Sequence, residues 1–291
     1  MIALALHGGA GAKQGRDYTA EIANMRQVCE TARTALQGGA TALDVVTDVV
    51  TALEDSGLYV AGRGASPNAA GWYELDASLM NGADQSCGAI AALQGFKNPI
   101  QVARAVMDRT PHVMLAGEGA ALFANEQGFA GIADEDAYFQ RAGSFESNHP
   151  PGTLSHGTVG CVCLDSHGNL AAATSTAGVF GKLAGRVGDT PLIGAGTWAD
   201  AQTAISCTGQ GEYFIRVNAA AQLAFRHMAG QPLDEAAAQV LEQIAAMSGE
   251  GGLISVNVHG HVSVPFRSQG MKRAWFTSAH GAGNEITSEA F

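Results

Sequence analysis

The sequence predicts an α+β fold in which two stacked β-sheets are covered by helices. Strand-like and helical segments come in blocks. Strict alternation of strands and helices would instead favour a doubly wound parallel sheet. Several strands are apolar on both faces, and the second half of the chain begins again with strands. With 291 residues, 46% of them hydrophobic, the chain is long enough for a large core. We expect residues 1–291 to form a single domain.

The first half of the chain is predicted to begin with a buried strand over residues 2–6, followed by a glycine-rich turn. Two helices follow, because apolar residues recur at helical spacing and Gly38-Gly39 stops the first of them. A glycine-broken loop leads to a strand pair and two further helices. The expected ranges are helices over about 18–37 and 42–54, a loop over 58–68, strands near 73–79 and 87–93, and helices over 99–109 and about 115–127.

The second half is predicted to begin with a hairpin around the turn at residues 165–169. A further strand, two helices with apolar stripes and three more strands follow. The expected ranges are strands over 158–164, 170–176 and 203–207, helices over 212–228 and 233–247, and strands over 253–257, 262–266 and 272–277.

Charge and composition restrict the partners of the protein. The formal net charge is −11 and there is no basic run, which opposes binding to nucleic acid or to an anionic membrane. The start of the chain shows no basic leader or long apolar segment, so we expect a cytoplasmic protein. Five cysteines without a paired framework predict free thiols in a reducing compartment, with Cys161 and Cys163 on one face of a strand. No complete dinucleotide, phosphate-loop or zinc motif is present, so no cofactor is expected.

A polar loop meets an apolar strand at residues 157 and 158. Residues 144–155 are rich in Ser, Asn, His, Pro and Gly, which predicts an exposed loop, and residues 159–164 are apolar. Hydrolysis of the Gly157–Thr158 bond would give Thr158 a free α-amine beside its own hydroxyl. Nucleophile and base would then lie on one residue. We therefore predict a cut between Gly157 and Thr158.

Three polar segments downstream interrupt otherwise apolar or glycine-rich sequence. They are residues 174–176, 186–189 and 207–212. Taken singly, each has an ordinary explanation: a threonine that ends a strand is a good β-former, an Arg and an Asp three positions apart form a solvated pair, and Gly-x-Gly makes a turn. Spacing alone leaves their roles open.

Five blocks stand in order along the chain: His7-Gly8-Gly9-Ala10-Gly11, Gly157-Thr158-Val159-Gly160, residues 168–176, residues 185–196 and Ser206-Cys207-Thr208-Gly209. Together they resemble the plant-type L-asparaginase and isoaspartyl aminopeptidase family of N-terminal nucleophile hydrolases. The resemblance covers nearly the whole chain. The resemblance implies an αββα four-layer sandwich, made as an inactive precursor that cuts itself into an α part (residues 1–157) and a β part (residues 158–291). It also implies a dimer of αβ units.

The resemblance implies catalytic roles for four residues. Thr158 would be the nucleophile, Thr176 would hydrogen-bond near it, and Thr208 and Gly209 would form the oxyanion hole. Self-cleavage at this bond is chemically reasonable, because Gly157 has no Cβ and leaves its carbonyl open to attack by the Thr158 hydroxyl. The freed α-amine, with a reference pKa of about 7.7–8.0, is partly neutral near pH 7 and can take the hydroxyl proton. The Thr208 hydroxyl and Gly209 N–H are the donors that a developing oxyanion needs.

Substrate binding is implied for three further residues. Arg186 would hold the α-carboxylate of the substrate, and Asp189, helped by Gly211, its α-ammonium. A guanidinium grips a carboxylate through two parallel hydrogen bonds, while a carboxylate accepts from an ammonium. The implied substrates therefore carry a free aspartyl head group: L-asparagine and β-aspartyl (isoaspartyl) dipeptides.

The loop over residues 53–63 resembles the family's sodium-binding loop and implies a structural sodium ion held by backbone carbonyls. These carbonyls would be those of Leu53, Glu54, Ser56, Tyr59, Ala61 and Arg63. Because carbonyls carry no side-chain signature, an ordinary connecting loop explains the same residues. The chain departs from the family at Val60, where an asparagine is usual, and Val60 neither donates nor accepts a hydrogen bond. A short loop before Thr158 is a second departure.

The leading hypothesis is a self-processing threonine hydrolase that acts on L-asparagine or β-aspartyl dipeptides. A nearer alternative is a glycosylasparaginase, which shares the nucleophile but acts on sugar-linked asparagine. An alternative of another class is a relative that stays uncut and binds aspartyl ligands without catalysis, motivated by Val60 and the short loop. The sequence does not rank asparagine against isoaspartyl peptides.

Overall fold

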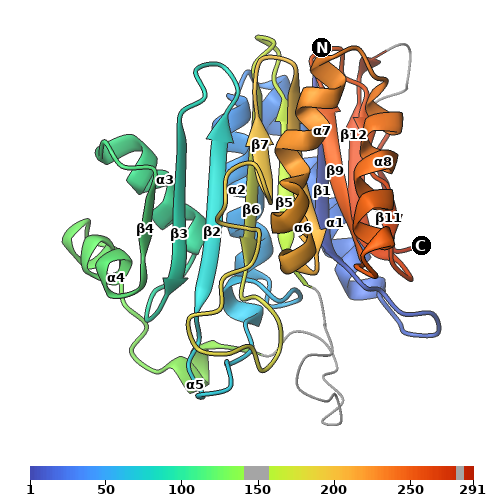
Figure 1. Cartoon of the computed structure of the whole chain (residues 1–291). Helices are drawn as coiled ribbons and strands as arrows, with labels where there is room; N and C mark the ends of the chain where they lie inside the picture. Colours follow the sequence, from blue (N-terminus) through green and yellow to red (C-terminus); the bar gives the residue numbers. More distant parts are fainter. Residues whose placement is uncertain (141–156, 280–284) are drawn as a thin grey trace.

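The computed structural model describes residues 1–140, 157–279 and 285–291 of the chain. These residues form an αββα sandwich, in which two β-sheets face each other and helices cover both outer faces (Figure 1). The predicted α+β class with two stacked, helix-covered sheets is confirmed. The exposed loop predicted over residues 144–155 lies outside the described residues.

The larger sheet contains the N-terminal strand and the strand that follows Thr158. Its strands are β1 (Ala3–Ala10), β2 (Leu75–Asn81), β3 (Cys87–Leu93), β4 (Met114–Ala116), β5 (Val159–Leu164), β6 (Leu170–Thr176), β12 (Met271–Thr277) and β13 (Thr287–Glu289). They lie in the order β13-β12-β1-β5-β6-β2-β3-β4. All neighbours are antiparallel except the parallel pair β3 and β4. The central strands β1, β5 and β6 are buried throughout, as their apolar residues predict.

The smaller sheet contains the strand that ends at Gly209. Its strands are β7 (Thr197–Ala199), β8 (Thr203–Gly209), β9 (Gly251–Asn257), β10 (Val262–Ser263) and β11 (Phe266–Arg267). The order is β10-β9-β8-β7, and β11 also pairs with β9. The single strand predicted over residues 262–266 is wrong, because two short strands stand there instead. Pro265 lies between them and has no N–H to donate to a strand ladder.

Helices cover the two sheets from outside. The elements are α1 (Thr19–Gln37), α2 (Ala42–Asp55), the 3₁₀ turn η1 (Gly62–Gly64), α3 (Pro99–Arg109), α4 (Gly117–Glu126), α5 (Glu135–Tyr138), α6 (Gly211–Val217), α7 (Ala219–Met228) and α8 (Leu233–Ala246). Helices α1, α2 and α3 pack on the larger sheet, and α6, α7 and α8 pack on the smaller one (Figure 1). The helix expected from residue 115 begins at residue 117, because β4 occupies residues 114–116.

The continuous helix predicted over residues 212–228 is wrong, because it breaks at Asn218 into α6 and α7. Asn218 has a φ of 50°, the left-handed conformation that ends a helix. The first amides of α7 then donate outside the helix: Ala221 N–H donates to the Gly194 carbonyl at 2.8 Å. The break therefore joins α7 to the loop before β7.

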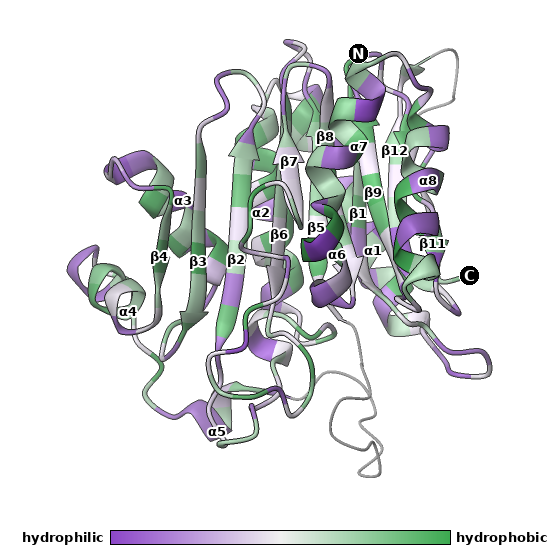
Figure 2. Cartoon of the chain, viewed as in Figure 1, coloured by the Kyte–Doolittle hydropathy of each residue, from purple (hydrophilic) through white to green (hydrophobic). Residues whose placement is uncertain are grey.

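Apolar side chains form three layers between the four layers of the sandwich. Strand β5 contributes to two of them, since Cys161 and Cys163 face the helices α1 and α2 while Val162 and Leu164 face the smaller sheet. This confirms the predicted common face of the two cysteines. Figure 2 shows hydrophobic strands inside and hydrophilic residues on the outer sides of the helices. Within the described ranges, no helix combines the length and the apolar character that crossing a membrane requires.

Candidate active site

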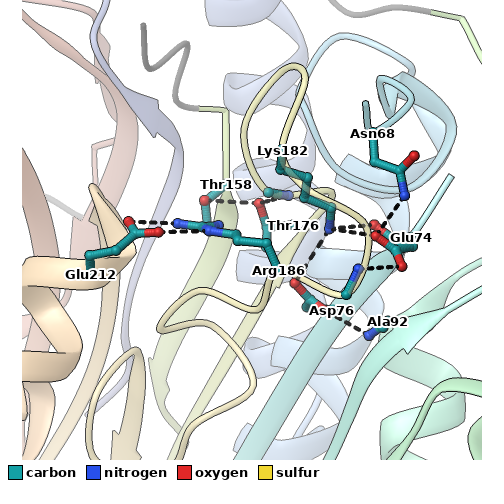
Figure 3. A network of polar contacts seen from close by, with 11 residues as sticks. Asn68, Glu74, Asp76, Ala92, Thr158, Thr176, Lys182, Arg186 and Glu212 are labelled. Carbon is teal, nitrogen blue, oxygen red and sulfur yellow. Dashed lines mark hydrogen bonds and ion pairs between the residues drawn. The ribbon is translucent and has the colours of Figure 1, made fainter. Parts of the chain in front are cut away.

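Thr158 lies at the entrance to the central strand β5 and contacts the end of the neighbouring strand β6. Its hydroxyl donates to the Thr176 hydroxyl at 3.1 Å (Figure 3). Thr176 Oγ1 also accepts from the Gly178 N–H at 3.0 Å, so its position is fixed from two sides. Thr158 is only 8% exposed. The structure therefore brings together two of the predicted catalytic residues, shielded from most of the solvent.

The residue before Thr158 has no room for a side chain. A Cβ built on Gly157 would lie 2.5 Å from Val60 Cβ and 2.6 Å from Val60 N. Val60 is itself held in place, because its carbonyl accepts from the Ala177 N–H at 2.9 Å. The structure thus packs Val60, the departure from the family pattern, directly against the predicted cleavage site.

Thr208 and Gly209 end strand β8 and are joined to β1. Thr208 Oγ1 accepts from the Ala10 N–H at 3.1 Å, which leaves the hydroxyl proton to be donated elsewhere. The same strand β1 holds Thr158, since His7 Nδ1 lies 3.0 Å from the Thr158 carbonyl oxygen. His7 and Ala10, three positions apart on β1, therefore hold the predicted nucleophile Thr158 and the predicted oxyanion donor Thr208.

The predicted carboxylate-binding residue already holds a carboxylate. Arg186 donates from Nε and Nη2 to the two oxygens of Glu212, at 2.9 and 2.8 Å (Figure 3). Glu212 is the second residue of α6 and its side chain is 57% exposed. The solvated Arg186–Asp189 pair, which spacing alone left open, is not formed, because Arg186 turns to Glu212 instead.

Asp189 and Gly211 lie in contact. A Cβ built on Gly211 would lie 2.8 Å from Asp189 N and 2.9 Å from Asp189 Oδ1. Asp189 is buried, and its Oδ2 has no hydrogen-bond partner among the described residues. Burial raises the pKa of Asp189 to about 7, and Arg186 opposes this rise. A buried carboxylate with a free oxygen suits a cationic ligand.

A buried ion cluster beside Thr176 does not follow from the sequence patterns. Lys182 Nζ lies 3.9 Å from Asp76 Oδ2 and donates to the Glu74 carbonyl at 3.1 Å (Figure 3). Asp76 is the register partner of Thr176 on the neighbouring strand. Burial raises the pKa of Asp76, and the nearby Lys182 cation opposes that rise. One signal existed in the sequence: Lys182 is the single charged residue among residues 177–185.

The loop predicted to hold sodium is closed on itself. A Cβ built on Gly62 would lie 2.7 Å from Glu54 Cα, so the two ends of the loop touch. Four of the six predicted carbonyls accept a hydrogen bond, which leaves each a second lone pair. These are Leu53 from Ser56 Oγ, Tyr59 from Ala61 N, Ala61 from Gly64 N and Arg63 from Gln140 N. In the part of the chain that the structure describes, no cluster of three His, Cys, Asp or Glu residues suits a metal. An oxygen-only carbonyl set fits a hard cation such as sodium.

Comparison with known proteins agrees with the sequence blocks. The asparaginase family profile matches residues 1–148 and 134–284. Isoaspartyl peptidase of Salmonella typhimurium is 42% identical over 94% of this chain and 94% of its own, and that of Escherichia coli is 42% identical over 94% and 92%. Isoaspartyl peptidase/L-asparaginase of Bos taurus is 38% identical over 91% and 90%. On sequence, fold and arrangement of residues, the chain belongs to the asparaginase family.

Proposed function

We propose that the protein is an amidohydrolase with an N-terminal threonine nucleophile, which cleaves β-aspartyl dipeptides, L-asparagine, or both. The observation that carries the proposal is the 3.1 Å contact between the hydroxyls of Thr158 and Thr176, directly after a glycine without room for a side chain. The names of the relatives support the substrate class: two are isoaspartyl peptidases and one is an isoaspartyl peptidase/L-asparaginase.

Maturation begins, in this proposal, when Thr158 Oγ attacks the carbonyl carbon of Gly157. The peptide C–N bond breaks as the ester C–O bond forms, and the Thr158 nitrogen takes a proton and becomes an amine. Water then hydrolyses the ester, which yields residues 1–157 and residues 158–291. No cofactor is required for these steps.

Turnover uses the new amine as the base. It takes the proton of the Thr158 hydroxyl, whose oxygen attacks the β-carbonyl of the aspartyl group. The Thr208 hydroxyl and Gly209 N–H stabilise the resulting oxyanion. The ammonium of Thr158 then gives its proton to the amide nitrogen of the substrate, and the C–N bond breaks to release ammonia or an amino acid. Water hydrolyses the remaining acyl-enzyme ester, which frees aspartate and the Thr158 hydroxyl.

The aspartyl head group is placed by Arg186, Asp189 and Gly211. The unpaired Asp189 Oδ2 accepts from the substrate α-ammonium, and Gly211 keeps open the space beside this carboxylate. Arg186 donates two hydrogen bonds to the Glu212 carboxylate in the structure. In the proposed reaction the α-carboxylate of the substrate takes the place of Glu212. Substrates with a blocked α-amine or α-carboxylate should therefore be poor.

Three further properties belong to the proposal. The closed loop with its carbonyls at Leu53, Glu54, Ser56, Tyr59, Ala61 and Arg63 would hold a structural sodium ion. All five cysteines are free thiols, which supports a cytoplasmic location. The αβ units would pair as dimers, for which the exposed apolar residues Val113, Met114 and Leu122 on and beside the edge strand β4 offer a surface.

The test combines mass spectrometry, N-terminal sequencing and turnover. The expected result is two fragments, the smaller one beginning at Thr158, and release of aspartate from L-asparagine or a β-aspartyl dipeptide. Thr158→Ala should abolish both, whereas Thr287→Ala, at an exposed threonine of β13, should abolish neither. Activity only on sugar-linked asparagine would favour the glycosylasparaginase alternative. A wild-type chain that stays whole and inactive would favour the non-catalytic alternative.

A further inference from the structure

A chain of buried polar side chains crosses the interior between the two sheets. It consists of His7, Ser78, Thr174, Thr197 and Ser206, all fully buried, and we call it the polar seam. His7 Nε2 lies 3.0 Å from Ser206 Oγ, and Ser206 Oγ lies 2.7 Å from Thr174 Oγ1. Thr174 accepts from Thr197 at 2.6 Å, and Ser78 Oγ lies 2.7 Å from Thr197 Oγ1. The seam joins strands of both sheets.

One end of the seam holds the nucleophile. His7 Nδ1 lies 3.0 Å from the Thr158 carbonyl oxygen, which can only accept a hydrogen bond. His7 must therefore carry a proton on Nδ1. Burial lowers the pKa of His7 to about 3, so the ring is neutral and has only this one proton. Its Nε2 is then an acceptor, and Ser206 must donate to it.

The other end of the seam holds the loop with Asp189. Ser78 Oγ lies 2.6 Å from the carbonyl oxygen of Thr190, the residue after Asp189. The same loop packs against Gly196, where a Cβ would lie 2.5 Å from the Asp189 carbonyl oxygen. The seam thus connects the nucleophile with the loop that binds the substrate ammonium in the proposed function.

The backbone is shaped around the bond between His7 and Ser206. Gly160 lies beside it on β5, and a Cβ there would overlap Ser206 Oγ and lie 2.5 Å from His7 Nε2. Aliphatic side chains would fill the apolar layer between the sheets at a lower cost in free energy, because buried polar groups lose their hydrogen bonds to water. A packing role alone does not explain this arrangement.

We propose that His7 and Ser206 are positioning residues, which fix the orientation of Thr158 relative to the Asp189 loop. The inference rests on the proposed function. Once the bond before Thr158 is cut, the residue is tethered covalently only through its carbonyl side, and the His7 N–H donates a hydrogen bond to that carbonyl. Ser206 secures this bond by donating to Nε2, which holds the His7 ring in the plane that points Nδ1–H at the Thr158 carbonyl. Without Ser206, the ring loses its second partner and can turn away from that carbonyl.

The test measures turnover by Ser206→Ala per cleaved chain. We expect kcat to fall about 10-fold or more, with KM changed less than about threefold, because misplaced reacting groups slow the chemical step. Ser206→Thr, which retains the hydroxyl, should recover most of kcat. Ser255→Ala is the matched control, since Ser255 is an equally buried hydroxyl of the same sheet outside the seam.

Nitrogen-15 NMR of the imidazoles gives a readout that a merely structural role would not move. The wild type should show a neutral Nδ1–H ring, identified by its loss in His7→Asn. In Ser206→Ala the Nε2 resonance of this ring should move toward that of an imidazole nitrogen that accepts no hydrogen bond. A Ser206→Ala chain that folds and stays uncut, while Ser255→Ala is cut normally, also supports the positioning role, because self-cleavage needs the same orientation of Thr158. If Ser206→Ala does not fold, the isosteric pair Ser206→Thr and Ser206→Val replaces it, because that pair differs only in the hydroxyl.

Two failures are distinguishable. An inactive wild type would refute the proposed function. An active wild type with Ser206→Ala cleaved, folded and less than 10-fold slower in kcat would refute the positioning role alone.

Discussion

Gly157 and Val60 are packed so closely that the cleavage-site residue has no space for a methyl group. A Cβ on Gly157 would meet the Cβ of Val60 at 2.5 Å and its backbone nitrogen at 2.6 Å. Because one of the two obstacles is backbone, a change of rotamer at Val60 does not remove it. The residue before Thr158 is therefore packed against Val60 on the side where a side chain would stand.

Gly157→Ala should slow self-cleavage strongly. The added methyl group must push residues 157 and 158 away from Val60, and a small misplacement of reacting atoms costs on the order of 100-fold in rate. Mass spectrometry of the purified chain over time measures the cut fraction. Gly119→Ala is a fair control, because a Cβ there meets nothing within 4 Å. Normal cleavage of Gly157→Ala would contradict the packing argument.

Val60→Asn should speed cleavage and turnover. An amide in this position can hydrogen-bond to groups beside Gly157, and one well-placed donor is worth roughly 100-fold in favourable cases. The substitution should also lower the melting temperature slightly, because it buries a polar group. Val60→Ala separates the two effects, since it loosens the contact without adding a donor. Equal rates for Asn and Ala would show that the hydrogen bond is not the cause.

Glu212→Gln should lower KM for L-asparagine and β-aspartyl dipeptides. The Glu212 carboxylate occupies two of the five N–H donors of Arg186, one on Nε and one on Nη2, so it competes with the α-carboxylate of the substrate. We expect a decrease of about 3- to 10-fold with kcat nearly unchanged, since uniform binding affects KM alone. Glu242→Gln, at the exposed ion pair with Arg267, serves as control. An increase of KM would instead mean that Glu212 orients Arg186 for the substrate.

KM should depend on pH through Asp189. Burial raises the pKa of Asp189 to about 7, and only the ionised carboxylate, present above that pH, binds the substrate α-ammonium. KM should therefore be constant above pH 8. Below pH 7 it should increase by up to about tenfold for each pH unit. Steady-state kinetics between pH 5.5 and 8.5 check this, and Asp189→Asn should bind weakly at every pH. A constant KM across this range would exclude Asp189 as the ammonium partner.

Glu54→Gln should stabilise the protein increasingly with pH. Burial raises the pKa of Glu54 to about 8 from an ordinary 4.5, so the folded state holds a proton that the unfolded state releases. Wild-type stability is thus lost as pH rises from 4.5 to 8, by up to about 1.4 kcal/mol per pH unit. Denaturant unfolding at pH 5 and pH 8, in the uncut Thr158→Ala background, measures the difference. Glu126→Gln, at an exposed glutamate, is the control.

Much of the fold was predictable because local patterns specify it. The strands β1, β5 and β6 are apolar on both faces, and α2 carries a valine stripe, so their type and approximate ends follow from the chain itself. The break at Asn218 was not predictable, because carbonyls of a distant loop replace the helical hydrogen bonds. Likewise, short strands such as β7 and β13 exist only by pairing with neighbours.

The sequence by itself determined the sandwich of two sheets, the junction at Thr158 and, through family blocks, the residues that stand around it. Residue types, spacing and hydrophobic period are properties of short segments, and a linear reading captures them. Only the tertiary structure decided that Arg186 is held by Glu212, that Val60 closes on Gly157 and that His7 meets Ser206, 199 positions away. Contacts of this kind depend on which segments folding brings together, and burial then sets the protonation state of groups such as His7 and Asp189.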